Sequence, residues 1–216
     1  MVLNDREIRA LLKQGELLLE PFDTALVQPA SVDLRLDDFA RIIKADSGEI
    51  DLRSAQHSDA YEDVHIADGG YVIPPGGLLL GQSLEHMRIP ATCKGMIEQR
   101  SSLMRLGIQV SSSLINPGYA GNLPLFIFNA TGRAIRVFAG VPFCQLVLLR
   151  LSGRPDVIYS EKPDAKYHEE RKFLTSKISE DAQRWIAPSA RLVHPEQAED
   201  FQMEMSTVEA SDDKVR

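Results

Sequence analysis

The sequence predicts a mainly β fold, a sandwich or barrel of short strands that follows one N-terminal helix. Between residues 28 and 151, brief apolar runs alternate with turn residues, as they do in all-β domains. The first of these runs, residues 31–36 (SVDLRL), alternates with a period of two and is typical of a half-buried strand. The chain also has 14 Gly and 12 Pro, enough for the many turns that such a fold needs.

The first element is a helix. Asn4 or Asp5 can accept hydrogen bonds from the unpaired amides of a first helical turn, and apolar residues follow from Ile8 onward. We assign Leu11, Leu12 and residues 17–19 to the apolar side of this helix.

Strands follow from residue 28. Turns at residues 74–77 (PPGG), 116–118 (NPG) and 139–142 (AGVP) separate them. The expected strands are residues 31–36, 40–44, 70–73, 78–84, 94–98, 107–110, 123–129, 135–138 and 144–151.

The C-terminal part has a different character. From residue 154 the chain is polar and irregular through residue 177, and residues 180–186 predict an amphipathic helix before Pro188. Residues 196–216 are rich in acids and poor in large apolar side chains, so we expect them to pack weakly.

Composition excludes several classes. A net charge of -7 and a pI near 5.3 argue against a protein that coats nucleic acid. No apolar run approaches the roughly 20 residues of a membrane-spanning helix, and residues 1–10 lack a signal-peptide pattern, so we expect a cytoplasmic protein. Cys93 and Cys144 are expected to be reduced core thiols.

The most informative segment for chemistry is residues 100–107 (RSSLMRLG). Arg100 and Arg105, with the hydroxyls of Ser101 and Ser102, form a plausible phosphate cradle, because a guanidinium group presents a fork of donors. A solvated turn with charged flanks is the alternative interpretation of this segment alone.

Together with other segments, this motif resembles the dCTP deaminase branch of the dUTPase superfamily. The resemblance covers residues 2–178 and is carried by residues 28–36, 73–76, 80–85, 100–107, 116–121, 140, 145–146, 159, 164–167 and 176–178. It implies a distorted jelly-roll of the β-clip type, a homotrimer with nucleotide sites at subunit boundaries, and Mg²⁺ that enters bound to the triphosphate. The expected organisation is a domain at 1–178 and a C-terminal extension at 179–216, partly helical and then acidic.

The resemblance also implies roles for individual residues. Arg100, Ser101, Ser102 and Arg105 would contact phosphates or complete the neighbouring subunit's site. Tyr119 would line the sugar or base of dCTP or dUTP. The residues expected to close over the triphosphate are Tyr159, Lys166 and Tyr167.

The catalytic positions depart from the family pattern. Phe126 stands where the deaminases have a glutamate that activates water, and Asn116 where dUTPases have an aspartate. The segment between Gly107 and Asn116 is about two residues shorter than the resemblance implies, and its serines at 111–113 replace the part that shapes the base pocket. Glu170 stands where the family tends to have a phosphate-binding glutamine, and its charge would oppose a triphosphate.

Two hypotheses remain open. In the first, the chain is a dCTP deaminase, with or without dUTP hydrolysis, that uses a displaced acid such as Glu98; His168 is a weaker candidate for proton transfer. In the second, it is a catalytically silent, trimeric nucleotide-binding or regulatory protein. A zinc deaminase is disfavoured, because Cys93 and Cys144 lack the ligand spacing that this chemistry needs.

Overall fold

The computed structural model describes residues 1–45, 48–54, 58–111, 113–173 and 175–186. The chain divides into two compact units. The larger is built from residues 1–50 and 56–176, and the described residues of the smaller are 51–54 and 177–186. All the strands among the described residues belong to the larger unit.

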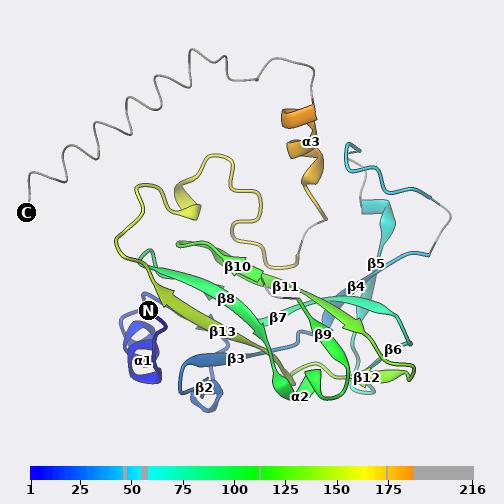
Figure 1. The fold of residues 1–216 in the computed structure, drawn as a ribbon, viewed down its shortest axis with the longest axis horizontal. Helices are drawn as coiled ribbons and strands as arrows, with labels where there is room; N and C mark the ends of the chain where they lie inside the picture. Colours follow the sequence, from blue (N-terminus) through cyan, green and yellow to red (C-terminus); the bar gives the residue numbers. More distant parts are fainter. Residues whose placement is uncertain (46–47, 55–57, 112, 174, 187–216) are drawn as a thin grey trace, which may run out of the picture. The chain divides into compact units, whose positions relative to one another are not determined.

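Helix α1 (Asp5–Lys13) confirms the predicted N-terminal helix (Figure 1). Asn4 Oδ1 accepts from the Glu7 amide at 3.1 Å, and Glu7 Oε2 accepts from the Asn4 amide at 3.1 Å, which completes a capping box. The assignment of residues 17–19 to this helix is wrong. Gly15, with φ +70°, takes the left-handed conformation that commonly ends helices, and β1 (Leu18–Glu20) follows as a strand.

Two antiparallel sheets form the larger unit and confirm the mainly β prediction. The six-stranded sheet has the order β5-β4-β7-β11-β9, with β1 paired to β7, and the five-stranded sheet has the order β10-β8-β13-β3-β2. The first contains β1, β4 (Phe39–Ile43), β5 (Tyr61–His65), β7 (Leu78–Arg88), β9 (Ile108–Val110) and β11 (Ala120–Asn129). The second contains β2 (Val27–Gln28), β3 (Ser31–Arg35), β8 (Cys93–Gln99), β10 (Ser113–Ile115) and β13 (Pro142–Arg150).

The remaining elements are short. A two-stranded sheet pairs β6 (Tyr71–Ile73) with β12 (Ile135–Val137). The helices are α2 (Ser101–Met104), α3 (Ile178–Ile186) and the 3₁₀ turns η1 (Thr24–Leu26), η2 (Ser58–Ala60) and η3 (Tyr159–Glu161). All the predicted strands are present, whereas β1, β2, β5 and β10 were not predicted.

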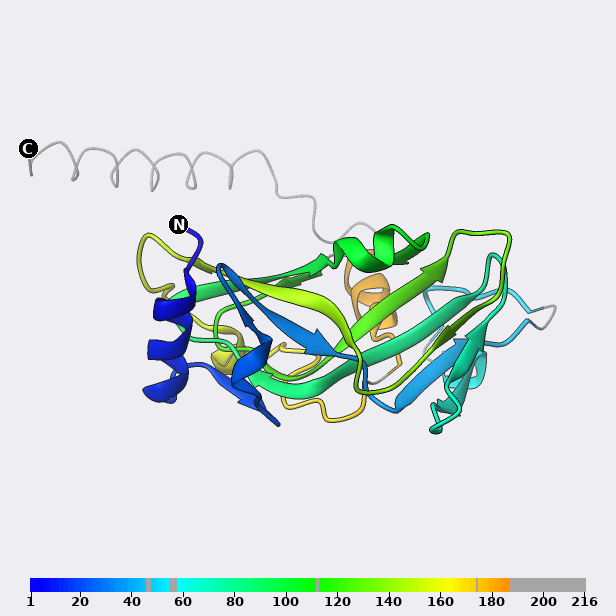
Figure 2. The same ribbon diagram turned by 90° about the horizontal axis from the view of Figure 1, so that it is seen from below.

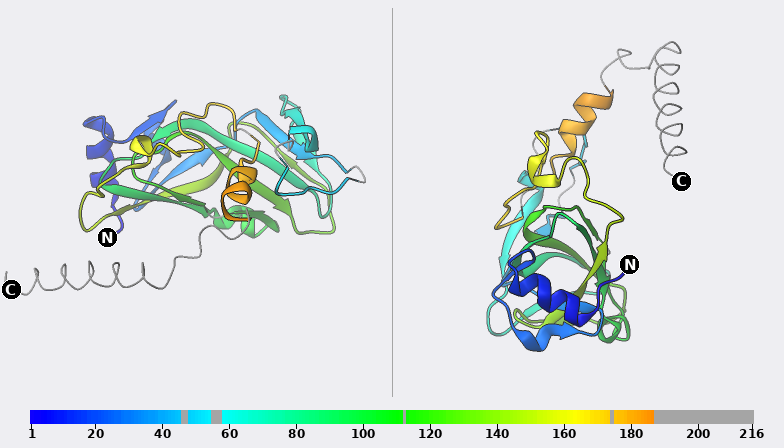
Figure 3. Two further views of the ribbon diagram at one scale, coloured as in Figure 1. Left: turned by 90° about the horizontal axis from the view of Figure 1, so that it is seen from above. Right: turned by 90° about the vertical axis from the view of Figure 1, so that its left-hand side faces the viewer.

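The core consists of aliphatic side chains from both sheets. Leu146 on β13 pairs with Val32 on β3 and with Ile97 on β8, and all three are at most 1% exposed. Each such side chain contributes about 1.5–3 kcal/mol by leaving water. Ile8 of α1 also belongs to this cluster, and α1 lies across one end of the sheets (Figure 3, right).

Both cysteines lie in this core. Cys93 and Cys144 are buried and unbridged, which confirms the expected thiols. Burial is the main reason that the pKa of the Cys144 thiol is raised above its ordinary value, so this thiol stays protonated.

Strands β7 and β11 run side by side through the six-stranded sheet (Figure 2). Their register shifts between Asn122 and Pro124, where a bulge accommodates a proline inside the sheet. Ser83 Oγ accepts from the Leu123 amide at 2.8 Å, and Asn122 Nδ2 donates to the Ser83 carbonyl at 2.9 Å. These bonds hold the start of β11 in place.

A strand-free stretch, residues 159–173, follows β13 and is called the closing segment below. The Asn122 amide donates to the Glu170 carbonyl at 2.7 Å, and the Glu169 amide donates to the Ala120 carbonyl at 2.8 Å. At its end, the Phe173 amide donates to Gln82 Oε1 at 3.0 Å and Arg41 donates to the Phe173 carbonyl at 2.7 Å. The closing segment is therefore tied to the start of β11 and to β7.

The C-terminal helix was also predicted. Helix α3 covers the expected residues 180–186 and begins two residues earlier. The acidic stretch at 196–216 lies outside the described residues. None of the helices in the described part of the chain has the length and apolar composition needed to cross a membrane.

Candidate functional site

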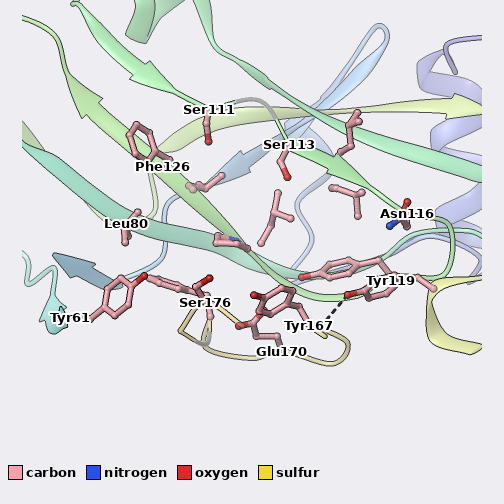
Figure 4. A pocket seen from close by; sticks show the side chains of 17 residues that line it. Tyr61, Leu80, Ser111, Ser113, Asn116, Tyr119, Phe126, Tyr167, Glu170 and Ser176 are labelled. Atoms are coloured by element: carbon pink, nitrogen blue, oxygen red, sulfur yellow. Dashed lines mark hydrogen bonds between the residues drawn. The ribbon is translucent and has the colours of Figure 1, made fainter. Parts of the chain in front are cut away.

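A cavity of about 460 Å³ lies between the closing segment and the strands β10 and β11 (Figure 4). The turn between these two strands supplies Asn116 and Tyr119, and β11 supplies residues 123–126. We call this cavity the tyrosine pocket. Its lining is Tyr61, Leu80, Ser111, Ser113, Leu114, Ile115, Asn116, Tyr119, Leu123, Pro124, Leu125, Phe126, Tyr159, Tyr167, Glu170, Phe173 and Ser176.

Aromatic rings form one wall of the tyrosine pocket. The Tyr119 and Tyr159 ring centroids are 5.9 Å apart at an interplanar angle of 48°. The Tyr119 hydroxyl donates to the Asn122 carbonyl at 3.2 Å, and the Tyr159 hydroxyl accepts from the Tyr167 amide at 3.1 Å. Rings held in this way can pack against the flat face of a ligand.

Tyr119 remains a neutral phenol. Burial, and then the negative charge of Glu170 and the proximity of Tyr159, raise the pKa of its hydroxyl above the ordinary value. The hydroxyl therefore acts as a hydrogen-bond donor and not as a base.

Glu170 is the only acid among the lining residues that the structure describes (Figure 4). It is 6% exposed. None of the described lining residues is Lys, Arg or His.

The two positions where the family's acids were expected both face the tyrosine pocket. Phe126 is 43% exposed and pairs with Leu80 across β11 and β7. Asn116 accepts the Tyr119 amide through its carbonyl at 3.1 Å, which closes the turn. Ser111 and Ser113 also line the pocket, whereas residue 112 lies outside the described residues.

The predicted phosphate motif lies elsewhere in the chain. Arg100 precedes α2, and neither it nor Ser101, Ser102 or Arg105 lines the tyrosine pocket. Ser101, Ser102 and Arg105 are exposed. The structure therefore does not bring this motif together with Tyr119 within one chain.

Arg100 already has a structural partner. Its Nη2 lies 3.3 Å from Asp33 Oδ2 and its Nη1 donates to the Pro142 carbonyl at 3.1 Å. Asp33, whose side chain is 5% exposed, also accepts from Gln145 at 3.0 Å and from Gln28 at 3.3 Å. These contacts hold Arg100 against β3 and the start of β13, directly after the end of β8.

Three other sequence candidates lie outside the tyrosine pocket. Lys166 is half-buried beside Tyr167 but is not a lining residue, and neither is Glu98, which pairs with Gln145 across β8 and β13. His168 lines a separate cleft of about 510 Å³, and its Nδ1 is buried without a hydrogen-bond partner.

In the part of the chain that the structure describes, no three or more His, Cys, Asp or Glu side chains are grouped as metal ligands would be.

Sequence reasoning missed Tyr61 and Phe173. Phe173 packs against Phe39, with ring centroids 5.6 Å apart, and the Arg41 guanidinium lies 5.1 Å from the Phe173 ring centroid. No local pattern signals either residue, because the pairing of β5 with β4 places Tyr61 and contacts with Phe39 and Arg41 place Phe173.

Comparisons with known proteins agree on one family. Residues 2–151 match the model of the dCTP deaminase-like family. The "dCTP deaminase, dUMP-forming" of Persephonella marina is 33% identical over 179 residues, 82% of this chain and 97% of that protein. The protein of the same description from Rhodococcus opacus is 37% identical over 182 residues, 82% of this chain and 96% of that protein.

A solved structure also matches, and it too is a dCTP deaminase. The crystal structure of 2'-deoxycytidine 5'-triphosphate deaminase from Agrobacterium tumefaciens matches with a TM-score of 0.55 and 28% identity. The match covers 68% of this chain and 47% of that longer chain.

Proposed function

The chain belongs to the dCTP deaminase-like family, and from this we propose that it binds a deoxyribonucleoside triphosphate, dCTP or dUTP, in the tyrosine pocket. The observation that carries the proposal is the aromatic wall formed by Tyr119 and Tyr159 around a cavity of about 460 Å³. Tyr167, on the closing segment, lies on the same side of the cavity. Such a wall suits a nucleotide, because its base is flat and its sugar is less polar than its phosphates.

The phosphates need cationic donors that the pocket lining of one chain does not supply. Arg100, Ser101, Ser102 and Arg105 carry those donors outside the pocket, which favours a site completed by a neighbouring chain. We therefore propose a homotrimer in which α2 of one subunit faces the tyrosine pocket of the next, and Mg²⁺ enters bound to the triphosphate. Sedimentation equilibrium should give the mass of three chains of 24.0 kDa, and a monomer at micromolar concentration would contradict this assembly.

The family reaction converts dCTP and water to dUTP and ammonia, and we propose that this chain catalyses it poorly or not at all. A phenyl ring at position 126 neither accepts nor donates a proton, and the amide of Asn116 is not a carboxylate base. A positioned acid or base contributes typically 10²–10⁴-fold to such a step. Neither position supplies one.

Turnover is the second candidate, because both sequence relatives are described as dCTP deaminases. Glu98, the acid considered from the sequence, is not a lining residue of the tyrosine pocket. In this second candidate Glu98 would act from a neighbouring chain, as proposed for Arg100, so Glu98→Gln should abolish turnover and leave binding nearly intact; unchanged turnover would rule this base out.

One experiment separates the two candidates. Purified protein is incubated with dCTP and Mg²⁺ for hours, and dCTP, dUTP, dUMP and pyrophosphate are resolved by ion-exchange chromatography. Nucleotide binding is measured on the same preparation by calorimetry. Binding without product supports the silent nucleotide-binding protein. Product above a control without protein establishes an enzyme, and absence of binding for both dCTP and dUTP would refute the site.

A further inference from the structure

Arg41 connects the closing segment to the six-stranded sheet, next to the tyrosine pocket. It lies on β4, opposite Leu80 on β7 and opposite Asp63 on β5. Leu80 lines the pocket, and so does Tyr61 at the start of β5 (Figure 4). The Arg41 side chain, which is 17% exposed, donates to the carbonyl of Phe173, a third lining residue. Arg41 therefore joins three elements that form one part of the pocket wall.

The amide, the carbonyl and the ring of Phe173 all have partners. The amide donates to Gln82 Oε1 at 3.0 Å, the carbonyl accepts from Arg41 Nη1 at 2.7 Å, and the ring packs against Phe39 with the centroids 5.6 Å apart. The Arg41 guanidinium also lies 5.3 Å from the Phe39 ring centroid and 5.1 Å from the Phe173 ring centroid. We call these contacts of Phe173 with Arg41, Gln82 and Phe39 the latch. Gln82 is 1% exposed and Phe173 is 6% exposed, so the latch is largely shielded from water.

The latch holds the end of the closing segment in the wall of the tyrosine pocket. Gln82 Nε2 also donates to the Arg171 carbonyl at 3.2 Å, so side chains of the sheet hold residues 171–173. Further back along the segment, the Glu170 carbonyl accepts from the Asn122 amide at 2.7 Å, a bond between two backbones. A point substitution removes a side-chain bond and leaves the backbone bond in place. Loss of the Arg41 side chain therefore frees Phe173 to leave the pocket wall while the attachment to β11 remains.

We propose that Arg41 is a positioning residue of the nucleotide site, which keeps Phe173 in the pocket wall and so sets how fast a bound nucleotide leaves. Arg41 is not among the described lining residues, so it acts through Phe173. One guanidinium group fixes Phe173 in two ways, because it makes a charge-assisted hydrogen bond to the carbonyl and a cation–π contact with the ring. The inference rests on the proposed function, since the ligand whose release Arg41 controls is the nucleotide in the tyrosine pocket.

Three variants separate the latch from the ion pair that Arg41 also makes. Arg41→Gln removes the guanidinium group, and Arg41→Lys keeps a positive charge beside the two rings and a donor for the Phe173 carbonyl. Asp63→Asn is the matched control, because it removes the charge of the ion-pair partner at 2.7 Å, on a side chain that is 65% exposed, and leaves the contacts of Arg41 with Phe173. Thermal melts establish that all the proteins are folded.

Two rates are measured on the parent and the three variants. The first is hydrogen exchange of the Phe173 amide without ligand, which reports the opening of its bond to Gln82. The second is the dissociation rate of radiolabelled dCTP and of dUTP, bound with Mg²⁺ and chased with excess unlabelled nucleotide.

We expect Arg41→Gln to raise both rates by about tenfold or more, because a hydrogen bond from a charged donor typically changes an equilibrium by at least that factor. Arg41→Lys should restore part of this change, and Asp63→Asn should keep both rates within about twofold of the parent. A merely structural role of Arg41 would lower Tm and leave the dissociation rate unchanged. An unchanged dissociation rate in Arg41→Gln, or an equal increase in Asp63→Asn, would overturn this inference alone. If neither dCTP nor dUTP binds the parent, the proposed function is overturned, and this inference with it.

Discussion

The Arg100–Asp33 ion pair allows the phosphate role of Arg100 to be separated from its structural role. Replacing Arg100 by Ala removes the 3.3 Å contact to Asp33 and the 3.1 Å hydrogen bond to the Pro142 carbonyl. The Asp33 carboxylate, with a side chain only 5% exposed, then keeps only the amide donors of Gln28 and Gln145. An unpaired buried carboxylate is costly because it has lost its hydration without regaining an opposite charge.

The expected loss of unfolding free energy follows from the two contacts that Arg100→Ala removes. Breaking a buried ion pair by removing one partner typically costs about 3–5 kcal/mol. The Arg100 side chain is 29% exposed, so water screens part of the interaction and the lower end of that range applies. We expect Arg100→Ala to lower the free energy of unfolding by about 3 kcal/mol, or to lower Tm by roughly 6–12 °C for a chain of this length.

The assay is urea denaturation followed by circular dichroism, on Arg100→Ala, Asp33→Asn and the double variant. The two substitutions should be coupled, with the double variant less destabilised than the sum of the singles by about 1–3 kcal/mol. Arg105→Ala is the control, because Arg105 is exposed and the change should stay within about 0.5 kcal/mol. A loss below 0.5 kcal/mol for Arg100→Ala, or additive effects, would show that the Arg100–Asp33 ion pair does not stabilise the fold. In the proposed trimer, Arg105→Ala tests triphosphate binding without this loss of stability.

Two further predictions concern the wall of the tyrosine pocket. A Cβ atom on Gly121, whose φ is +148°, would lie 2.7 Å from the Tyr119 hydroxyl and 3.0 Å from the Glu170 carbonyl, so Gly121→Ala should destabilise the protein by about 2 kcal/mol and abolish ligand binding. For Gly132→Ala, the added Cβ has no atom within 4 Å. This control variant should keep both the stability and the ligand binding of the parent in the same denaturation and calorimetry experiments. Because the pKa of Tyr119 is raised in the folded protein, the unfolded chain loses that proton first, and stability falls as the pH rises above the unfolded value of about 10. Denaturation curves at pH 10 and 11 should show the parent losing about 1 kcal/mol more than Tyr119→Phe, and equal losses would contradict the raised pKa.

Elements set by neighbours in the chain were predictable from the sequence. Asn4 caps α1 through Glu7, three residues away, and Val32 and Leu34 lie in the core as their alternation predicts. The strand is not half-buried as predicted, however, because Ser31 and Asp33 are buried too. The helix assignment at residues 17–19 failed because Leu18 and Leu19 belong to β1, whose partner strand β7 is distant in the sequence. Apolar residues in a short run do not distinguish a helix from a strand until that partner is known.

The mainly β class, the turns and the family were predictable from the amino-acid sequence, because they depend on residue types at short spacing and on motifs in a given order. Which candidate residues share a site depends on the folded chain. It places Phe126, Asn116, Tyr119 and Glu170 around one cavity, and Arg100 beside Asp33 away from it. The physical reason is that a pocket is made by the pairing of distant strands and by the closing segment, whose hydrogen bonds to Ala120 and Asn122 span about fifty residues of chain. Residue spacing along the sequence does not specify those contacts.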